Sequence, residues 1–397
     1  MSWTRRADCR LCGGPLDLVL DYGEVALANA LRASPDLPEP RTPLRLCRCA
    51  ACGLVQVPEV VDPRLLFGEY RYATGTSRTM ADHLAALAAA LAAEHPGARV
   101  LELASNDGTL LAALARQGLH PLGIEPARAL ATHARDRGLP TRAAFFDADL
   151  ARTLRQEEGL FDVVVATNLL AHVDDPVGLL RGAASLLARG GEVVVEVPSL
   201  AAMLAQGAFD TVYHEHLCVF SRQSLLDLFA RAGLGVRRFE ELAVHGGSLR
   251  VHAAPGPHAA QALALARAEA PLCSAQALAG LAEGAHAARR ALRAQLDLLR
   301  GRGLRVAAYG ASAKGAVLVQ WCGITDLPWV ADANPRKVGL FLPGTATPIV
   351  DPAHIASDPP DVLLLLAWNL ADEIRTLLGG RVPHLLLPLP HPRLIPG

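Results

Sequence analysis

The spacing of hydrophobic residues changes character near residue 99. From there, short apolar runs end in polar turns and then continue with helical spacing, as in "RVLELASNDGTLLAALARQG", "LGIEPARALATHARDRG" and "FDVVVATNLLAHVDDP". Strands that alternate with helices are typical of a parallel sheet covered on both faces. We therefore expect an α/β domain here, completed by a strand in "GEVVVEVPS" and a strand pair in "RRFEELAVHGGSLRVHAAP".

A second unit of the same kind begins near residue 304. The stretches "LRVAAYGASAKGAVLVQ", "LPWVADANPRKVG" and "PDVLLLLAWN" again start as apolar strands that end in polar turns. Residues 257–300, which lie between the two units, are rich in Ala, Leu and Arg with helical spacing and no strand signal. The pattern predicts two doubly wound units joined by a helical connector.

Length and charge restrict the class of protein. A chain of 397 residues exceeds one ordinary core, and we expect three domains. The formal net charge of −1 gives no global basic field, so we expect neither a nucleic acid nor a membrane as partner. The sequence contains no uninterrupted apolar stretch of about 18 residues and begins without the apolar core of a signal peptide, which favours a cytoplasmic enzyme or binding protein.

The cysteines cluster near the N-terminus. Five of the eight fall in "CRLC" and "CRCAAC", within the first 52 residues. Cys9, Cys12, Cys49 and Cys52 form two Cys-x2-Cys knuckles and leave Cys47 over, which is the spacing of a tetrahedral zinc site. Four thiolates leave no open coordination position, so we expect the zinc to be structural. Reduced, buried cysteines are the alternative interpretation.

The turn in "VLELASNDGTLL" has the position of a cofactor site, because it lies between a strand and a helix. It lacks the G-x-G-x-x-G spacing that brings a backbone close to a pyrophosphate, and it offers Asp107 and small polar groups instead. About 20 residues on, Glu125 ends the next strand, where an acid accepts hydrogen bonds from ribose hydroxyls. S-adenosylmethionine, a nucleoside without phosphates, meets these demands. NAD is the weaker alternative, and both acids could also simply cap helices.

The stretch "TVYHEHLCVF" concentrates Tyr213, His214, Glu215 and His216 in a chain with 5% aromatic residues. These side chains meet the needs of proton abstraction beside a carbonyl, namely a base, a group that orients it and a donor to the oxyanion. His172 in "NLLAHVDDP" also follows a strand end. A His-x-His metal pair is disfavoured, because the spacing is not that of H-E-x-x-H, and solvated loop residues remain an alternative.

The second unit offers a cationic turn of its own. Lys314 and Lys337 are the only lysines among the 38 Lys and Arg residues, which indicates either sites that need a compact charge or chance. Lys314 lies in "YGASAKG", between a strand and a helix, where backbone N–H groups meet an anion. The motif is not a P-loop, because the lysine precedes the second glycine. Arg336 and Lys337 form another cationic turn, for which ordinary surface charges are an equal interpretation.

Taken in order, these motifs resemble the zinc-containing sugar C-methyltransferases. The resemblance rests on the two cysteine knuckles and on "ELASNDG", "NLLAHVDDP", "FDTVYHEHLCVFS", "HGGSLRV", "YGASAKG" and "DANPRKVGLFLPGT". It implies methylation of the carbon beside the ketone of a nucleotide-linked 4-keto-6-deoxy sugar, which we expect to be dTDP-linked and methylated at C-3, in deoxysugar and antibiotic biosynthesis. Rival hypotheses are an O- or N-methyltransferase, a nicotinamide-dependent sugar oxidoreductase and a non-catalytic scaffold.

The resemblance also implies a fold and a set of site residues. The fold is α/β, with an N-terminal zinc-binding module (1–70), a central class I S-adenosylmethionine methyltransferase domain of Rossmann-like fold (71–255) and a C-terminal part (256–397) that holds the connector and a second Rossmann-like domain; we expect a monomer. The catalytic residues are then His216, Tyr213, Glu215 and His172, with His216 or Tyr213 as base. The cofactor-binding residues are Tyr72, Ser77, Glu102, Asn106, Asp107, Gly108, Glu125 and Asn168. The substrate-binding residues are His214, Ser248, Lys314, Arg336 and Lys337.

Overall fold

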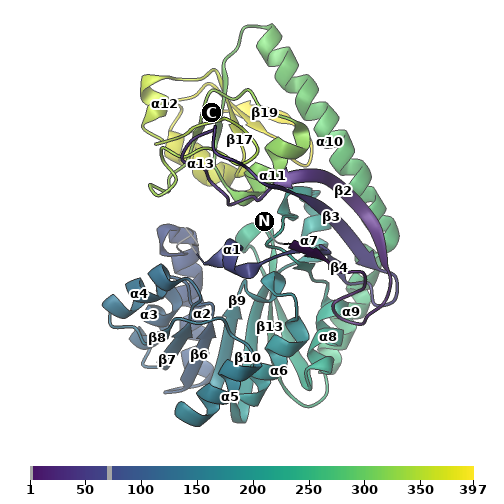
Figure 1. Ribbon diagram of the computed structural model, residues 1–397, viewed down its shortest axis with the longest axis vertical. Helices are drawn as coiled ribbons and strands as arrows, with labels where there is room; N and C mark the ends of the chain where they lie inside the picture. The colour runs from purple at the N-terminus through teal and green to yellow at the C-terminus, as the bar shows by residue number, and fades with distance from the viewer. Residues whose placement is uncertain (1–2, 69–73) are drawn as a thin grey trace.

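The computed structural model describes residues 3–68 and 74–397. Figure 1 shows a central domain below, a C-terminal domain above it, and N-terminal strands beside both. The central sheet has seven strands in the order β12-β13-β10-β9-β6-β7-β8. Their bounds are β6 Arg99–Leu103, β7 His120–Ile124, β8 Thr141–Arg142, β9 Phe161–Thr167, β10 Leu187–Pro198, β12 Leu234–Leu242 and β13 Ser248–Pro255.

The five neighbouring strands β10, β9, β6, β7 and β8 of the central sheet are parallel, and β13 runs antiparallel to its neighbours β10 and β12. The chain proceeds outward from β6 through β7 to β8 and then returns to β9 on the other side of β6. Doubly wound sheets bind ligands at this reversal, outside the carboxyl ends of the strands. The fold therefore places a ligand site at the turns that follow β6, β7 and β9.

Helices cover both faces of this sheet, as the alternating pattern predicts. On one face Val163, Val165 and Val194 share a core with α2 (Arg78–Glu94) and α3 (Thr109–Arg116). On the other, Val164 and Val193 face a second group of helices. That group is α5 (Ala148–Glu157), α6 (Pro176–Ser185) and α8 (Arg222–Arg231), while α4 (Arg128–Asp136) follows β7. Burial on both faces explains why these strands read as continuous apolar runs.

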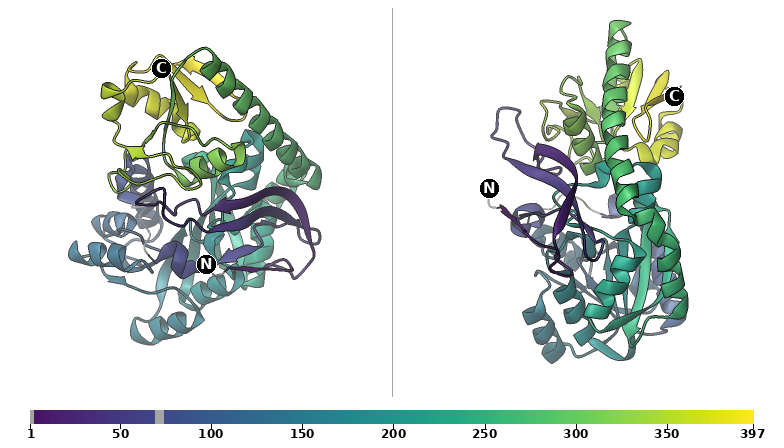
Figure 2. Two further views of the ribbon diagram at one scale, coloured as in Figure 1. Left: turned by 45° about the horizontal axis from the view of Figure 1, so that its top comes forward. Right: turned by 90° about the vertical axis from the view of Figure 1, so that its right-hand side faces the viewer.

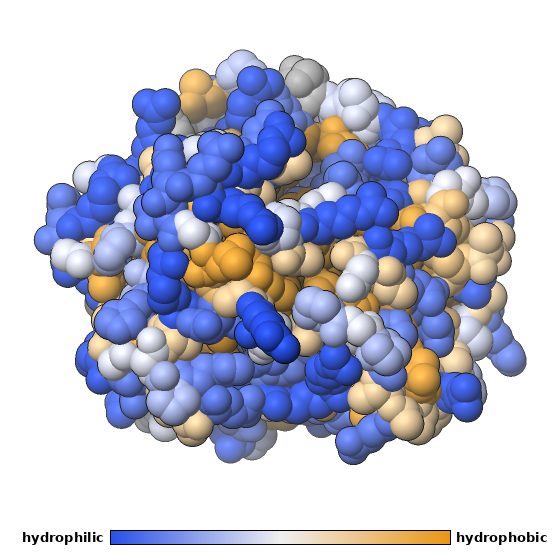
Figure 3. All heavy atoms as spheres, turned by 90° about the horizontal axis from the view of Figure 1, so that it is seen from below, coloured by the Kyte–Doolittle hydropathy of each residue, from blue (hydrophilic) through white to orange (hydrophobic). Residues whose placement is uncertain are grey.

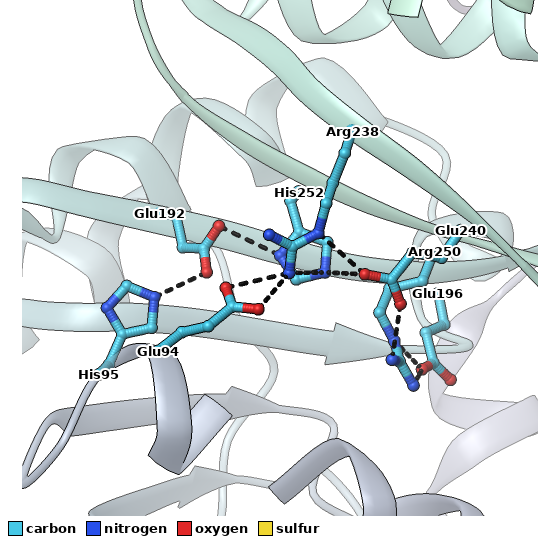
Figure 4. Close-up of polar contacts among 8 residues, drawn as sticks. All are labelled: Glu94, His95, Glu192, Glu196, Arg238, Glu240, Arg250 and His252. Carbon is cyan, nitrogen blue, oxygen red and sulfur yellow. Dashed lines mark hydrogen bonds and ion pairs between the residues drawn. The ribbon is translucent and has the colours of Figure 1, made fainter. Parts of the chain in front are cut away.

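The sheet face that carries α2 becomes polar toward β13 and β12, where ionisable side chains replace the apolar core (Figure 4). On β10, Glu192 contacts His95 at 2.9 Å and His252 at 3.1 Å. The other members of the network are Glu94, Glu196, Arg238, Glu240 and Arg250. Although burial opposes it, the hydrogen bonds and charges of the two histidines keep the pKa of Glu192 below its usual value. The network ties the C-terminal end of α2 to the sheet.

The C-terminal domain repeats the doubly wound plan. Its six strands have the order β16-β15-β14-β17-β18-β19, all parallel except for the antiparallel pair β18 and β19. Their bounds are β14 Val306–Tyr309, β15 Val330–Ala331, β16 Ile349–Val350, β17 Val362–Leu365, β18 His384–Leu387 and β19 Arg393–Pro396. The strand order reverses between β14 and β17. This second reversal is a second place for a ligand.

The helices of this part are α11 (Ala313–Cys322), α12 (His354–Ser357) and α13 (Ala371–Leu378). The connector predicted between the two units is indeed helical and comprises α9 (Ala260–Glu269) and α10 (Ala275–Gly301). In Figures 1 and 2, α10 extends from the side of the central domain along the C-terminal domain. Its buried residues, among them Leu292 and Leu296, belong to the C-terminal core.

The N-terminal strands connect the two domains (Figure 2). β2 (Leu16–Ala26), β3 (Arg41–Cys49) and β4 (Val55–Gln56) form an antiparallel sheet, and β11 (Cys218–Val219) of the central domain pairs with β4 at its edge. β1 (Trp3–Arg5) pairs with β5 (Glu59–Val61), and α1 (Pro63–Phe67) follows. Leu20 and Leu44 join the C-terminal core, whereas Leu11 and Leu54 join a core of the central domain. The module therefore packs against both domains at once.

Seen from below, the surface of the molecule is mostly hydrophilic, with hydrophobic side chains gathered near the middle of that face (Figure 3). The large fully buried residues instead lie within the cores, among them Phe161, Phe209, Phe220 and Phe229. Within the described ranges, no helix has both the length and the apolar character needed to cross a bilayer.

Candidate active site

Both strand-order reversals open onto one cavity of about 1550 Å³. The turns after β6, β7 and β9 line it from the central domain, through residues such as Ser105, Glu125 and Asn168. The turns after β14 and β17 line it from the C-terminal domain, through residues such as Lys314 and Trp368. A cavity with these walls has room for two ligands, one at each sheet.

The turn after β6 and the acid after β7 are joined by hydrogen bonds. Glu125 is 4% exposed, and its two carboxylate oxygens accept from the backbone N–H groups of Asn106 at 2.8 Å and Ala127 at 2.7 Å. Burial raises the pKa of Glu125, and these backbone donors oppose the rise. The carboxylate is thereby held at the carboxyl end of β7, with acceptor capacity left for the hydroxyls of a ribose.

A second acid, Glu102 on β6, lies on the wall of the same part of the cavity. It is 3% exposed, and its Oε2 has no hydrogen-bond partner within residues 3–68 and 74–397. Burial, and then the charges of Glu125 and Asp107, raise the pKa of Glu102 well above its usual value. Its protonated form is therefore favoured, and a protonated carboxyl has a hydrogen to donate to a ligand.

The remaining predicted cofactor residues fall into two groups. Ser77 and Asn168 line the cavity; Ser77 also caps α2 by accepting from the N–H of Met80. Asp107 and Gly108 do not line it but shape the turn: the Asp107 carboxylate accepts from the N–H of Gly75 at 2.8 Å, and Gly108 begins α3. Tyr72 lies outside the described residues.

The stretch that begins at Tyr213 contains a hydrogen-bonded pair, Tyr213 and His216. The Tyr213 Oη lies 2.7 Å from Nε2 of His216, and Nδ1 of the same ring lies 2.8 Å from the carbonyl oxygen of Thr211. Because a carbonyl only accepts, Nδ1 carries the hydrogen, and in the neutral ring Nε2 holds the lone pair. The Tyr213 hydroxyl therefore donates to His216.

The environment keeps this imidazole neutral. Burial, and then the charge of His172, lower the pKa of His216 well below its usual value. The rings of His172 and His216 meet edge to face with their centroids 4.9 Å apart. Burial also lowers the pKa of His172 to about 4, against the effect of a backbone hydrogen bond at Glu215. Nδ1 of His172 is buried without a hydrogen-bond partner in the part of the chain that the structure describes, and it is available to a ligand.

Glu215 lines the cavity but contacts neither histidine through its carboxylate in the hydrogen bonds described. Both of its oxygens accept from Nδ2 of Asn29, at 2.8 and 2.9 Å. Burial raises the pKa of Glu215 to about 7, and the Asn29 hydrogen bond opposes this. Glu215 is a candidate for the group that orients a neighbour in the predicted catalytic group. Its carboxylate is turned toward Asn29 of the N-terminal module.

The two lysines both line the cavity. Nζ of Lys314, in the first turn of α11, donates to the carbonyl of His245 at 3.0 Å, and Nζ of Lys337 donates to that of Ala311 at 2.8 Å. Burial lowers the pKa of Lys314, and the charge of Asp210 opposes this. Ser312 caps the same helix start, so backbone N–H groups and a lysine face the cavity together.

The other three predicted substrate residues do not line the cavity. His214 is 2% exposed, and its Nε2 donates to the carbonyl of Pro43 in β3. Ser248 donates to the carbonyl of Val244, and Arg336 is exposed on a surface turn. His214 and His216 thus point to different neighbours although they belong to one motif.

Residues 243–247 form a part of the cavity wall that we had not predicted to bind a ligand. His245 has a left-handed backbone with φ of 56°, and its carbonyl meets Lys314. Gly247 has φ of 107°, and a Cβ there would lie 2.4 Å from that of Ala202. Only glycine fits that close approach, which explains the "HGG" sequence that served only as a marker of resemblance.

The four predicted zinc ligands come together. The sulfur atoms of Cys9, Cys12, Cys49 and Cys52 all lie within 4.8 Å of one another, with the pairs Cys9–Cys52 and Cys12–Cys49 at 3.6 and 3.4 Å. Tetrahedral zinc with Zn–S bonds of about 2.3 Å separates its sulfurs by about 3.8 Å, so this donor set fits the ion. Cys47 lies outside the group, on β3.

Backbone and side-chain donors surround these sulfurs. Nε2 of Gln56 lies 3.2 Å from the Cys9 sulfur, and the N–H groups of Leu11 and Gly14 point to the sulfurs of Cys9 and Cys12. Such donors stabilise thiolates that bind a metal. A Cβ at Gly14 would lie 3.1 Å from the Cys49 sulfur, so glycine leaves the knuckle its space.

Comparison with known families defines the class. A family model described as "Methyltransferase domain" matches residues 71–238. It is flanked by one described as "Putative zinc binding domain" over residues 9–67 and one described as "C-methyltransferase C-terminal domain" over residues 243–380. With the four-cysteine cluster and the doubly wound central sheet, these matches define an S-adenosylmethionine-dependent methyltransferase that carries a zinc-binding module.

A full-length relative makes the identification more specific. The chain is 36% identical to the C-methyltransferase NovU of Streptomyces niveus over 98% of its own length and 96% of NovU. It belongs to the zinc-containing C-methyltransferase family and is a C-methyltransferase. A ubiquinone biosynthesis O-methyltransferase of Aeromonas salmonicida is 29% identical over 36% of this chain and 64% of its own length. The magnesium protoporphyrin IX methyltransferase ChlM from Synechocystis PCC 6803 covers 44% of this chain and 79% of its own, with 15% identity and a TM-score of 0.35.

Proposed function

We propose that the chain removes a proton from the carbon beside the ketone of a nucleotide-linked 4-keto-6-deoxy sugar and methylates that carbon. The expected substrate is dTDP-linked, and the methyl group is expected to be added at C-3, as part of deoxysugar and antibiotic biosynthesis. The observation that carries the proposal is the Tyr213–His216 pair, in which His216 is a neutral base on the cavity wall. Two lysines of the C-terminal domain lie on the wall of the same cavity. A base is needed for carbon methylation, since a C–H group has no lone pair to attack a methyl group.

The proposal assigns roles to His216, Tyr213 and His172 of the catalytic group. His216 takes the proton, because the pKa of its ring lies well below the usual value and leaves Nε2 unprotonated. The Tyr213 hydroxyl, already aimed at Nε2, turns to the developing enolate oxygen or passes its own proton to His216 while taking that of the substrate. His172 lies against His216 and assists the oxyanion. Bound S-adenosylmethionine supplies an electrophilic methyl group.

The proposal divides the cavity between the two ligands. Glu125 holds the ribose hydroxyls of the cofactor, with Glu102, Asn106 and Asn168 around it. Asp107 and Gly108 act indirectly by shaping the turn. On the opposite wall, Lys314 and Lys337 receive the diphosphate of the sugar nucleotide at the start of α11. Holding both reactants in one cavity supplies the approach geometry that the transfer needs.

The direct test is incubation with labelled S-adenosylmethionine and a panel of 4-keto-6-deoxy sugar nucleotides, followed by mass spectrometry and NMR. We expect one added methyl group bonded to carbon and loss of the C–H signal beside the ketone. A new methyl resonance on oxygen or nitrogen would contradict carbon methylation. Methylation of a different carbon of the sugar would contradict the assignment to C-3 and would leave carbon methylation itself intact.

The role of Lys314 gives a further prediction. Lys314→Ala should raise KM for the sugar nucleotide roughly ten- to a hundredfold, because a hydrogen-bonded charge at a phosphate is lost. The dissociation constant of S-adenosylhomocysteine, measured by calorimetry, should not change, since that ligand contacts the other sheet. Arg336→Ala, in the exposed turn outside the cavity, is the matched control and should leave KM unchanged. A weaker cofactor affinity in Lys314→Ala would refute the division of the cavity.

A further inference from the structure

Asn29 is a residue of the N-terminal module that reaches the catalytic group. It lies on the cavity wall, and its side-chain amide donates to both carboxylate oxygens of Glu215, at 2.8 and 2.9 Å. Glu215 is only 3% exposed. Within the described ranges, Glu215 takes part in no ion pair, so an uncharged amide is the partner of a buried acid. A buried carboxylate depends strongly on such a donor.

The segment that carries Asn29 is fastened at both ends to the C-terminal domain. Before it, the N–H of Ala26 donates to the side-chain oxygen of Gln320 at 2.8 Å, and the Gln320 amide donates back to the Ala26 carbonyl. After it, Arg32 and Phe341 exchange backbone hydrogen bonds. The Arg32 guanidinium also donates to the carbonyl of Thr345. Asn29 is therefore held in place against the C-terminal domain, while its side chain meets Glu215 of the central domain.

Glu215 has lone pairs left after Asn29 has donated. Each carboxylate oxygen accepts two hydrogen bonds, and one amide occupies one side of both. The remaining capacity suits a hydroxyl of a substrate in the cavity, provided that the acid is charged. The pKa of Glu215 is raised by burial to about 7, and the Asn29 amide opposes the rise. Removing that amide therefore moves the ionisation of Glu215 to higher pH.

We propose that Asn29 is a positioning residue, through which the zinc-binding module fixes the direction and the charge of the Glu215 carboxylate for binding a hydroxyl of the substrate. The inference rests on the proposed function, because it takes Glu215 to be part of the catalytic group. The zinc-binding module thereby takes part in the active site as well as in the fold.

The test compares the pH dependence of turnover in Asn29→Leu and in the unaltered enzyme. Leucine has nearly the shape of asparagine and no donor. If ionised Glu215 is required, the acid limb of the kcat/KM profile for the sugar nucleotide should move to higher pH by about one to two units, which is the effect of losing a hydrogen bond to a charged group. Activity should recover at high pH, and Asn29→Gln should restore part of it.

A double variant separates this role from a structural one. Asn29→Leu should add no further loss to Glu215→Gln, because both changes act on the same carboxylate. Zinc content and thermal melting show whether each variant has folded. Gln223→Leu is the matched control, because the Gln223 amide also donates to a carboxylate, that of Asp227, but on the exposed surface outside the cavity. If Asn29→Leu is too unstable, Asn29→Asp keeps the shape and replaces the donor by an acceptor.

Two results would overturn the inference. In the first, Asn29→Leu loses the same fraction of its activity at every pH, and the double variant loses activity by the product of the two single factors. That pattern reflects structural damage. The second is an inactive Glu215→Gln beside an unaltered Asn29→Leu, which would leave the proposed function intact. Full activity in Glu215→Gln would instead remove Glu215 from the proposed function, and the role of Asn29 with it.

Discussion

Replacing His216 by asparagine should abolish most turnover while both ligands still bind. A general base contributes about 10²–10⁴-fold to a rate, and asparagine keeps a polar side chain of similar position without a basic nitrogen. The Nδ1 contact to the Thr211 carbonyl can be kept by the asparagine amide, so the fold around the site should persist. Steady-state kinetics at saturating ligands and calorimetric titration of S-adenosylhomocysteine measure the two halves of this prediction.

Tyr213→Phe tests the rival assignment of the base. Phenol has a reference pKa near 10 and imidazole one near 6.5, so the histidine is the easier base and the tyrosine the better donor to an enolate oxygen. In the structure the Tyr213 hydroxyl already donates to Nε2, which also permits relay through the tyrosine. Deuterium exchange at the carbon beside the ketone, measured without the methyl donor, isolates proton abstraction from methyl transfer.

The pattern of exchange decides between these roles. Lost exchange in His216→Asn with slowed but measurable exchange in Tyr213→Phe is the expected result. Retained exchange in His216→Asn with none in Tyr213→Phe would make Tyr213 the base. Retained exchange in both variants would show that neither residue abstracts the proton and would contradict the proposed mechanism. Arg336→Ala serves again as the control, because it removes an exposed charge that is not part of the cavity wall.

The pH dependence of turnover is linked to the same residues. Burial lowers the pKa of both His172, to about 4, and His216, and it raises that of Glu215 to about 7. A base with a lowered pKa stays unprotonated throughout the neutral range, so its ionisation does not reduce turnover there. The acid limb near neutral pH should therefore report Glu215 and disappear in Glu215→Gln.

Local sequence was sufficient to predict the two sheets and the zinc cluster. Alternating strands and helices leave a strong pattern, and the spacing of Cys9, Cys12, Cys49 and Cys52 depends only on the knuckles themselves. The turns after β6 and β14 were also foreseen, because a ligand site follows from where a strand ends in a doubly wound sheet. Lys314 stood out because lysine is rare in this chain.

Long-range contacts left no such signal. Asn29 lies 186 residues from Glu215, and nothing in the surrounding "ALANALRA" distinguishes it from a polar loop residue. His214 and His216 are equivalent in composition and spacing, yet one meets β3 and the other meets Tyr213. The left-handed backbone of His245 is likewise set by tertiary structure. These side chains depend on the contact between domains, which periodicity does not encode.

Loss of zinc should have the second large effect. Changing Cys49 to serine removes one of four thiolates, and we expect the N-terminal module to lose its metal and its fold. Apparent zinc affinities in small structural sites correspond to about 10–16 kcal/mol, which exceeds or matches the whole stability of an ordinary domain. Elemental analysis should fall from one zinc per chain toward none, and hydrogen exchange should rise over residues 9–67 before it rises in the central sheet.

Cys47 provides the matched control. It lies two residues before Cys49 on β3, is also buried, and lies outside the sulfur cluster, so Cys47→Ala should keep the zinc. Because β4 pairs with β11 and the segment around Asn29 is fastened to the C-terminal domain, collapse of the module should also lower turnover. A Cys49→Ser enzyme that keeps one zinc, or a Cys47→Ala enzyme that loses it, would contradict the ligand set. A zinc-free enzyme with full turnover would show that the active site does not depend on the module.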